Sequence, residues 1–305
     1  MENINLKSIF NQLKVNAEWF GVRKVRESNT YRMIRDGNPQ ANSTGISHGI
    51  MVEVLKNGQF AYAASSDMST ASIQEAIDRA IIIAESSSKN PLYNFSEDVR
   101  PSNKGNYRSD RSKTDLPLKE INNILFKSYE SLKVSDKIVS ASATARITET
   151  NYQFLSSSGA EIEQDFLIIG SSFDAVSQDK GITQRRTDNG RGRMFQSGYE
   201  VFDELELTSM CNKIGEQAVE LLYADECPTE TTNLVLAPDQ MLLQIHESIG
   251  HPLEVDRILG DERNYAGWSF VREEDFGTLK YGSDIMNITF DPTIKKELAS
   301  YGFDD

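Results

Sequence analysis

Apolar residues recur with the three- and four-residue spacing of an amphipathic helix in several stretches of the chain. The clearest is residues 70–87, where Ser69 offers an N-terminal cap and Ile73, Ile77 and neighbouring alanines share one face. The same spacing predicts helices over residues 5–16, from Pro117 onward and over 204–224.

Between these helices the pattern changes to the two-residue alternation that is typical of strands. Strands are predicted over residues 19–26, 30–35, 50–55, 59–63, 138–150, 152–156, 160–174 and 232–237. Asn57-Gly58 suits the positive φ angles of a tight hairpin turn, and Ser158-Gly159 marks a second turn. The polar segments 36–49 and 88–116 are predicted to be connections.

An antiparallel meander with helices on one face predicts an α+β fold. The shift in pattern near residue 226 places a domain boundary there, so the chain is divided into domains 1–225 and 226–305.

Composition narrows the class of protein. Hydrophobic residues make up 38% and charged residues 26% of the 305 positions, as in ordinary globular proteins. The net charge of −14 argues against binding to nucleic acid or to an anionic membrane. We expect a cytoplasmic protein, since the N-terminus lacks the pattern of a secretory signal and the two cysteines are too few for a disulfide framework. Cys211, on an apolar helix face, is predicted to be a reduced core thiol.

The candidate chemistry lies in His246-Glu247-Ser248-Ile249-Gly250-His251, which holds two of the three histidines of the chain. Imidazoles are common zinc ligands, and a neighbouring carboxylate can act as a base on water at the metal. The third histidine, His48, follows a polar segment and is predicted to lie in a loop.

The spacing of the two motif histidines requires an unusual backbone. Residues five apart on a regular helix point roughly 140° away from each other. A widened, π-like turn before Pro252 would bring His246 and His251 to one side. The helix is predicted to start at Pro238 and to be anchored to a core by four apolar side chains, Met241, Leu242, Ile245 and Ile249.

Three alternatives remain open at this level. The histidines could simply flank Glu247 without binding a metal. Glu254 and Asp256 could orient the imidazoles or be exposed carboxylates. The basic run from Arg185 and Arg186 to Arg191 and Arg193 is interpreted as a solvated loop rather than as a grip on a peptide or carboxylate.

The pattern His246-Glu247-x-x-Gly250-His251-x-x-Glu254-x-Asp256 resembles the signature of the TldD/PmbA metallopeptidase family, also called modulators of DNA gyrase, in its TldD-like branch. The hairpin over residues 49–63, the capped helix after it and the Ser-Gly turn are similar to the family's N-terminal domain. The resemblance implies an N-terminal α/β domain followed by the start of a β-rich metallopeptidase domain.

Carried over from the resemblance, His246 and His251 would bind Zn²⁺ and Glu247 would be the general base that acts on a metal-activated water. The family's third ligand is a cysteine far downstream, so the chain is expected to be C-terminally truncated and to lack that ligand. The family further implies cleavage of peptides or unfolded protein segments, and a homodimer or a heterodimer with a family member. The alternative is a truncated or non-catalytic subunit that pairs with an active relative and contributes to the substrate cavity.

Overall fold

A computed structural model of the protein describes residues 4–91, 93–100, 102–190, 192–260, 262–263 and 265–303. The chain forms two compact units. The first contains the residues up to Ala224 together with those from Asp291 onward, and the second is Asp225–Phe290. The predicted domains, 1–225 and 226–305, remain a proposal.

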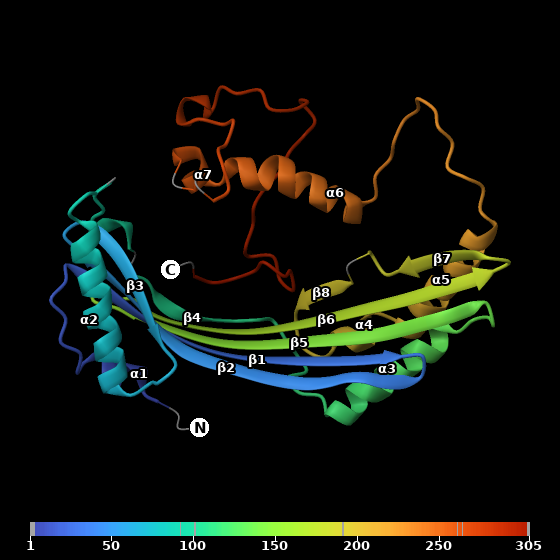
Figure 1. The fold of residues 1–305 in the computed structure, drawn as a ribbon, viewed down its shortest axis with the longest axis horizontal. Helices are drawn as coiled ribbons and strands as arrows, with labels where there is room; N and C mark the ends of the chain where they lie inside the picture. Colours follow the sequence, from blue (N-terminus) through green and yellow to red (C-terminus); the bar gives the residue numbers. More distant parts are fainter. Residues whose placement is uncertain are drawn as a thin grey trace. The chain divides into compact units, whose positions relative to one another are not determined.

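The first unit is built on one twisted sheet of eight strands (Figure 1). The strand order is β3-β2-β1-β5-β6-β4, and β7 and β8 also pair with β6. The strands are β1 (Trp19–Arg35), β2 (Asn38–Lys56), β3 (Gln59–Ser65), β4 (Lys104–Arg108), β5 (Ile138–Ser156), β6 (Glu161–Asp179), β7 (Ile182–Thr187) and β8 (Arg193–Gln196).

Tight turns set the register of the meander. The predicted hairpin is confirmed: β2 and β3 flank Asn57 and Gly58, whose φ angles are 52° and 71°. The prediction of a connection over residues 36–49 is wrong, because β2 starts at Asn38 and a second such turn, Asp36-Gly37, joins it to β1. The polar half of β2 pairs through its backbone, which does not require apolar side chains.

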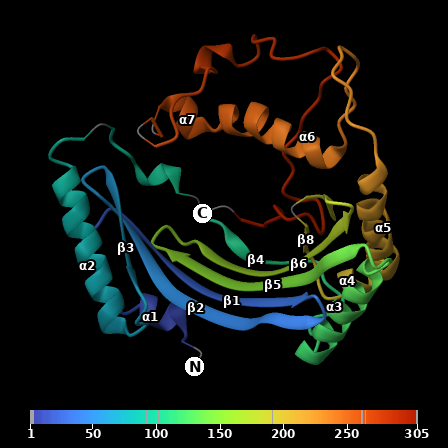
Figure 2. The same ribbon diagram turned by 45° about the vertical axis from the view of Figure 1, so that its right-hand side comes forward.

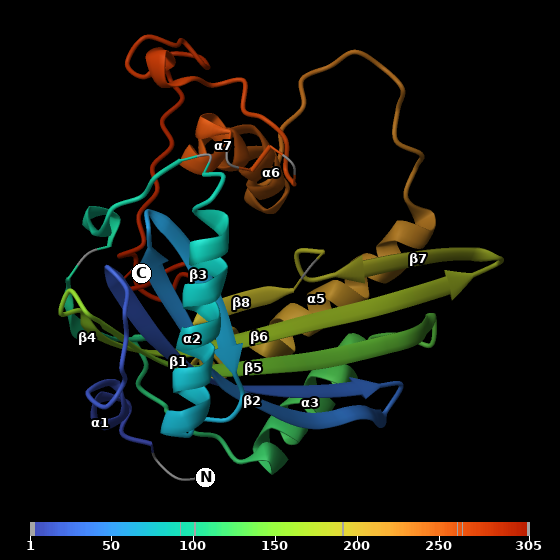
Figure 3. The same cartoon turned by 60° about the vertical axis from the view of Figure 1, so that its left-hand side comes forward.

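The prediction that residues 88–116 form only a connection is also wrong, because β4 lies within them. Strand β4 is parallel to β6, pairing Lys104 with Glu161 and Arg108 with Asp165. Figure 3 shows that β4, β8 and β7 follow one another along the same edge of β6. Segments from distant parts of the sequence therefore meet at this edge.

Helices cover one face of the sheet (Figure 2), as predicted, and confirm the α+β class. One core packs α1 (Leu6–Phe10) and α2 (Thr70–Ser87) against β1, β2 and β3. A second core packs α3 (Leu118–Leu132) and α5 (Leu207–Glu220) against β5 and β6. Within the described residues, every helix is too short or too polar to cross a lipid bilayer.

The opposite face carries a third, smaller apolar cluster. It contains Trp19, Leu55, Tyr152, Phe154, Ala160 and Ile162, and Phe303 packs against it. Since alternate residues of a strand point to opposite faces, this side is distinct from the helix-covered one. We call it the Trp19 face.

The helix predicted over residues 204–224 is shorter, because the backbone is interrupted at Glu206. This residue has a φ of 44°, in the left-handed region, and separates α4 (Val201–Glu204) from α5. Cys211 is fully buried on α5, as predicted, and burial raises the pKa of its thiol to about 12. The thiol is therefore protonated at neutral pH.

The second unit contains α6 (Pro238–Ile245), α7 (Val255–Leu259) and short helical turns over His246–Gly250, His251–Leu253 and Glu273–Asp275. The strand predicted over residues 232–237 is wrong: its backbone is irregular, and Leu234 and Val235 are 80% and 92% exposed. The apolar run alone was ambiguous, and within the described part of this unit only Ile249 and Val271 are buried apolar side chains.

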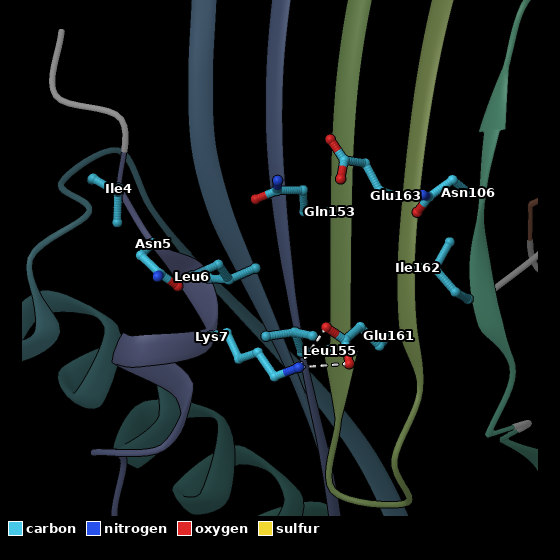
Figure 4. Close-up of a pocket in the computed structure, with 10 residues that line it drawn as sticks. All are labelled: Ile4, Asn5, Leu6, Lys7, Asn106, Gln153, Leu155, Glu161, Ile162 and Glu163. Atoms are coloured by element: carbon cyan, nitrogen blue, oxygen red, sulfur yellow. Dashed lines mark hydrogen bonds and ion pairs between the residues drawn. The ribbon is translucent and has the colours of Figure 1, made fainter.

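A polar pocket of about 500 Å³ lies beside α1 (Figure 4). Glu163 and Gln153 project from neighbouring strands, and Lys7 forms an ion pair of 2.6 Å with Glu161 across it. Both partners of this pair are largely exposed, so it contributes little to stability.

Asp188 is a buried carboxyl group whose titration should be visible in the stability of the fold. It is 4% exposed, and its Oδ1 accepts a 2.6 Å hydrogen bond from the Phe173 amide. Oδ2 is buried and has no hydrogen-bond partner among the described residues. Burial raises the pKa of Asp188 from 3.8 to about 6, although the charge of Arg193 opposes the shift. The charged form is thus disfavoured in the folded state.

The pKa of Asp188 is higher in the folded than in the unfolded state, so protonation of Asp188 stabilises the fold. This contribution to the free energy of unfolding is fully present below pH 3.8 and is lost as the pH rises through about 6. We expect the free energy of unfolding of the wild type, relative to Asp188→Asn, to fall by about 1–3 kcal/mol between pH 4 and pH 7. Urea denaturation at a series of pH values measures this difference, with the exposed Asp203→Asn as control. A difference that does not change with pH would contradict the assignment.

Candidate metal centre

Helix α6 begins where the sequence predicts it, with Pro238 in its first turn after the extended residue Ala237. Proline has no amide hydrogen to donate, so the first turn accommodates it without loss. The helix places the His-Glu motif directly after its last residue, Ile245.

The motif itself adopts the predicted π-like turn. Residues His246–Gly250 form a π-helical turn, and His251 opens a 3₁₀ turn that contains Pro252. The two imidazole rings lie with their centroids 4.3 Å apart at an interplanar angle of 71°. The five-residue spacing is thus converted into neighbouring side chains.

Three donor groups converge at this turn. One potential ligand atom from each of His246, Glu247 and His251 lies within 4.8 Å of the others. Ligand atoms around a tetrahedral zinc ion are about 3.4 Å apart, given bonds of about 2.0–2.1 Å. His246 and Glu247 are exposed and His251 is half-buried, so modest rotations of these side chains can close that difference. The donor set fits zinc in its chemistry.

A carboxylate fixes the orientation of His251. Its Nδ1 lies 2.8 Å from Glu254 Oε1, and Arg257 Nε donates a 3.0 Å hydrogen bond to the other carboxylate oxygen. The hydrogen bond with His251, and then the charge of Arg257, lower the pKa of Glu254. A carboxylate on Nδ1 favours the tautomer that leaves Nε2 with its lone pair free.

The structure separates the two carboxylates that follow the motif. Glu254 contacts His251, whereas the Oδ1 atom of the exposed Asp256 accepts a hydrogen bond from the Arg257 amide. Arg257 was not singled out from the sequence. Its place three residues after Glu254 on a helical segment was the signal that would have indicated it.

The predicted anchoring of the motif helix is largely wrong. Ile249 is buried, but Leu242 and Ile245 are 65% and 37% exposed, and α6 has no buried side chain. Instead, the motif turn is tied by polar contacts: Tyr281 donates a hydrogen bond to the Ser248 carbonyl, and Ser269 donates one to that of Pro252.

The other candidates lie outside this centre. Arg185 and Arg186 are on β7, paired with Asp174 and Gln217, rather than in a solvated loop. Arg193 begins β8, and Arg191 lies outside the described residues. His48 is an exposed residue of β2 rather than of a loop.

Replacing Glu254 should weaken metal binding without removing a ligand. Glu254→Gln is expected to lower zinc affinity about 10–100-fold, because the charged acceptor on His251 is lost. A competition titration with a chromophoric chelator measures the change. The matched control is Asp256→Asn, which changes a carboxylate that accepts a hydrogen bond from the Arg257 amide rather than from a histidine, and it should bind zinc within about threefold of wild type. An equal loss in both variants would rule out the orienting contact.

The fold and the motif together define an α+β protein with a histidine–glutamate metal motif. Family models agree with this class. The model described as PmbA/TldA metallopeptidase domain 1 matches residues 22–84. The one described as the PmbA/TldA metallopeptidase central domain matches residues 111–222, so that the two cover more than half of the chain. The chain belongs to the PmbA/TldD metallopeptidase family.

Two relatives are named as metalloproteases. That of Methanothermobacter thermautotrophicus is 27% identical over 308 residues, which span 98% of this chain and 62% of the relative. That of Methanocaldococcus jannaschii is 25% identical over 308 residues, spanning 99% of this chain and 64% of the relative. The chain thus spans less than two thirds of the length of either relative.

A solved structure described as a modulator of DNA gyrase, from Bacteroides thetaiotaomicron, is similar in fold. Its TM-score is 0.51 at 14% identity, and the match covers 72% of this chain and 48% of that chain. At this identity the likeness concerns the fold alone.

Proposed function

We propose that the chain carries the histidine–glutamate part of a zinc-dependent peptidase that cleaves peptides or unfolded protein segments. The observation that carries the proposal is the π-helical turn, which gathers His246, Glu247 and His251 at one place. Membership of a metallopeptidase family and two relatives named as metalloproteases support the class of reaction.

In this proposal the two imidazoles hold the metal and Glu247 moves the proton. Zinc bound between His246 and His251 would lower the pKa of water and polarise the scissile carbonyl. The Glu247 carboxylate, which is exposed beside both rings, would take a proton from water and deliver it to the leaving amine. Glu254 and Arg257 would keep His251 in the tautomer that binds the metal through Nε2.

Neither cysteine of the chain is proposed as the third ligand. Cys211 is buried in the core of the first unit with a raised pKa, and Cys227 precedes the motif as an exposed residue of the second unit. Catalytic zinc sites normally have three protein ligands, and the family resemblance implies that a downstream cysteine completes the set.

We further propose a cytoplasmic protein that acts as a homodimer or as a heterodimer with a family member. Exposed apolar side chains of the second unit, such as Leu242 and Leu253, support an assembly that covers them.

A zinc titration combined with a peptidase assay tests the proposal. A version of the protein that is extended to include the implied downstream cysteine is expected to bind one zinc ion per chain, and to cleave an unfolded protein until a chelator removes the metal. No zinc binding in the micromolar range would overturn the metal centre. If the protein binds zinc but cleaves only after a second family member is added, the result would instead favour the alternative of a non-catalytic subunit that pairs with an active relative.

A further inference from the structure

The segment from Asp291 to Phe303 returns to the first unit and lies along β8, β6 and β4 on the Trp19 face. Its contacts begin at β8, where the Gln196 amide donates a 3.2 Å hydrogen bond to the Lys296 carbonyl. They end at Phe303, the last described residue. The sheet thus holds a piece of polypeptide that is not one of its strands and that runs through a series of turns.

A buried glutamine on β6 binds the end of this segment through its backbone. Gln164 is 4% exposed, and its Nε2 donates a 2.9 Å hydrogen bond to the Phe303 carbonyl. Its Oε1 accepts hydrogen bonds of 3.1 Å from the amides of both Gly302 and Phe303. These contacts involve only the backbone of the segment, so they are available to any peptide that can adopt the same bend.

A second buried glutamine binds the segment a few residues earlier. Gln196 is 2% exposed, and its Nε2 donates hydrogen bonds of 2.5 Å to the Ser300 carbonyl and 3.3 Å to that of Leu298. Its Oε1 accepts from Tyr107 and Ser109 at 2.7 and 2.9 Å. Both lone pairs of the Gln196 oxygen are therefore used by Tyr107 and Ser109, and the amide nitrogen of Gln196 is directed at the segment.

Close packing selects the two residues at the end of the segment. A Cβ at Gly302 would lie 2.5 Å from Tyr107 Cβ, so only glycine fits there. The Phe303 ring packs against the Trp19 cluster, and a Cβ at Gly105 of β4 would lie 2.6 Å from that ring. The groove is thus shaped for a glycine followed by an aromatic residue.

Three apolar side chains of the segment are only partly covered. Ile294, Leu298 and Tyr301 are 50%, 46% and 41% exposed. The ion pairs of Lys296 with Glu204 and of Lys295 with Asp110 lie at the surface, where such pairs contribute little. A pocket of about 580 Å³ beside the segment, lined by Tyr107, Arg111 and Tyr301 among others, leaves room for more polypeptide.

We propose that this groove is a polypeptide-binding site for segments with a glycine followed by an aromatic residue, and that residues 298–303 occupy it as an internal ligand. The groove would hold a substrate of the proposed peptidase, and in that respect it rests on the proposed function. Binding itself requires no metal, since the contacts come from protein groups of the first unit.

The test uses a fluorescent, C-terminally amidated peptide with the sequence of residues 294–303, added to the full chain in the presence of a chelator. In the wild type the internal segment competes with the added peptide for the groove. The apparent affinity for the peptide is therefore lower the more of the time the internal segment occupies the groove. Phe303→Ala removes the ring that anchors the internal segment, and Gly302→Ala forces the segment against Tyr107. Both variants are expected to bind the peptide at least about tenfold more tightly than the wild type in fluorescence anisotropy.

The control variants separate binding in the groove from general effects. Gly45→Ala adds a Cβ in open space and should leave peptide affinity unchanged. In the Phe303→Ala background, Gln164→Ala should lower affinity at least about tenfold, whereas Gln178→Ala, an exposed glutamine of the same strand, should not. A peptide with alanine in place of the final Phe should not bind.

Equal peptide affinity in the wild type, Phe303→Ala and Gly302→Ala would overturn the proposal, as would full binding after loss of Gln164. Circular dichroism of each variant confirms the fold, and the Phe303→Ala result stands by itself if Gln164→Ala does not fold. The peptide titration is done without metal, and the zinc titration is done without peptide. A negative peptide titration therefore leaves the proposed metal centre unaffected, and a negative zinc titration leaves the proposed groove unaffected.

Discussion

Peptide hydrolysis by the zinc-loaded protein is expected to fall about 10²–10⁴-fold in the variant Glu247→Gln, with little change in zinc affinity. The amide keeps the size of the carboxylate but cannot accept a proton from water at neutral pH. Glu247 is exposed beside both imidazoles, where water can reach it. Initial rates with an unfolded protein substrate, measured beside a zinc titration, check both halves of this expectation.

The matched control is Glu230→Gln, which changes an exposed glutamate of the same unit that is not part of the donor cluster. Its rate and its zinc affinity should equal those of the wild type. If Glu247→Gln instead loses zinc affinity and activity in parallel, Glu247 is a ligand rather than the base. If it cleaves normally, the proposed mechanism is wrong.

Loss of either motif histidine should weaken metal binding, and the two losses should be similar in size. His246→Ala and His251→Ala are each expected to weaken zinc binding by at least about 100-fold, since removal of a ligand exceeds the cost of disturbing its orienting partner. Isothermal titration calorimetry on the intact chain measures this loss. The double variant should lose little more than either single one, because one imidazole with a carboxylate holds zinc poorly.

The chain contains its own control for this experiment. His48 is an exposed histidine of β2 and belongs to no donor cluster found among the described residues. His48→Ala should therefore bind zinc as the wild type does. Unchanged melting temperatures would show that the metal loss in the motif variants does not come from unfolding.

Much of the fold was predictable from local signals, and the misses have physical causes. Asn57-Gly58 predicted its hairpin because few dipeptides tolerate two positive φ angles. Asp36-Gly37 carries the same signal, but the polar residues after it concealed a strand whose pairing is set by β1. Strand β4 was missed because its partner lies far along the chain, in β6.

The candidate site was predictable in its chemistry and only partly in its surroundings. The spacing of His246 and His251 is incompatible with a regular helix, and this conflict predicted the π-helical turn. The exposure of Leu242 was not predictable in the same way, because periodicity reveals which residues share a face but not whether another element covers it. The Gln164 and Gln196 contacts depend on tertiary structure and left no pattern in the sequence.

The π-helical turn also relates this motif to the more familiar His-Glu-x-x-His arrangement. A π turn contains one residue more than an α turn, so the five-residue spacing corresponds to a one-residue insertion between the two histidines. Helices absorb such an insertion locally by bulging, without shifting the elements on either side. Two ligand sets that differ in sequence length can therefore present the same pair of imidazoles, and a search for fixed four-residue spacing would overlook the longer form.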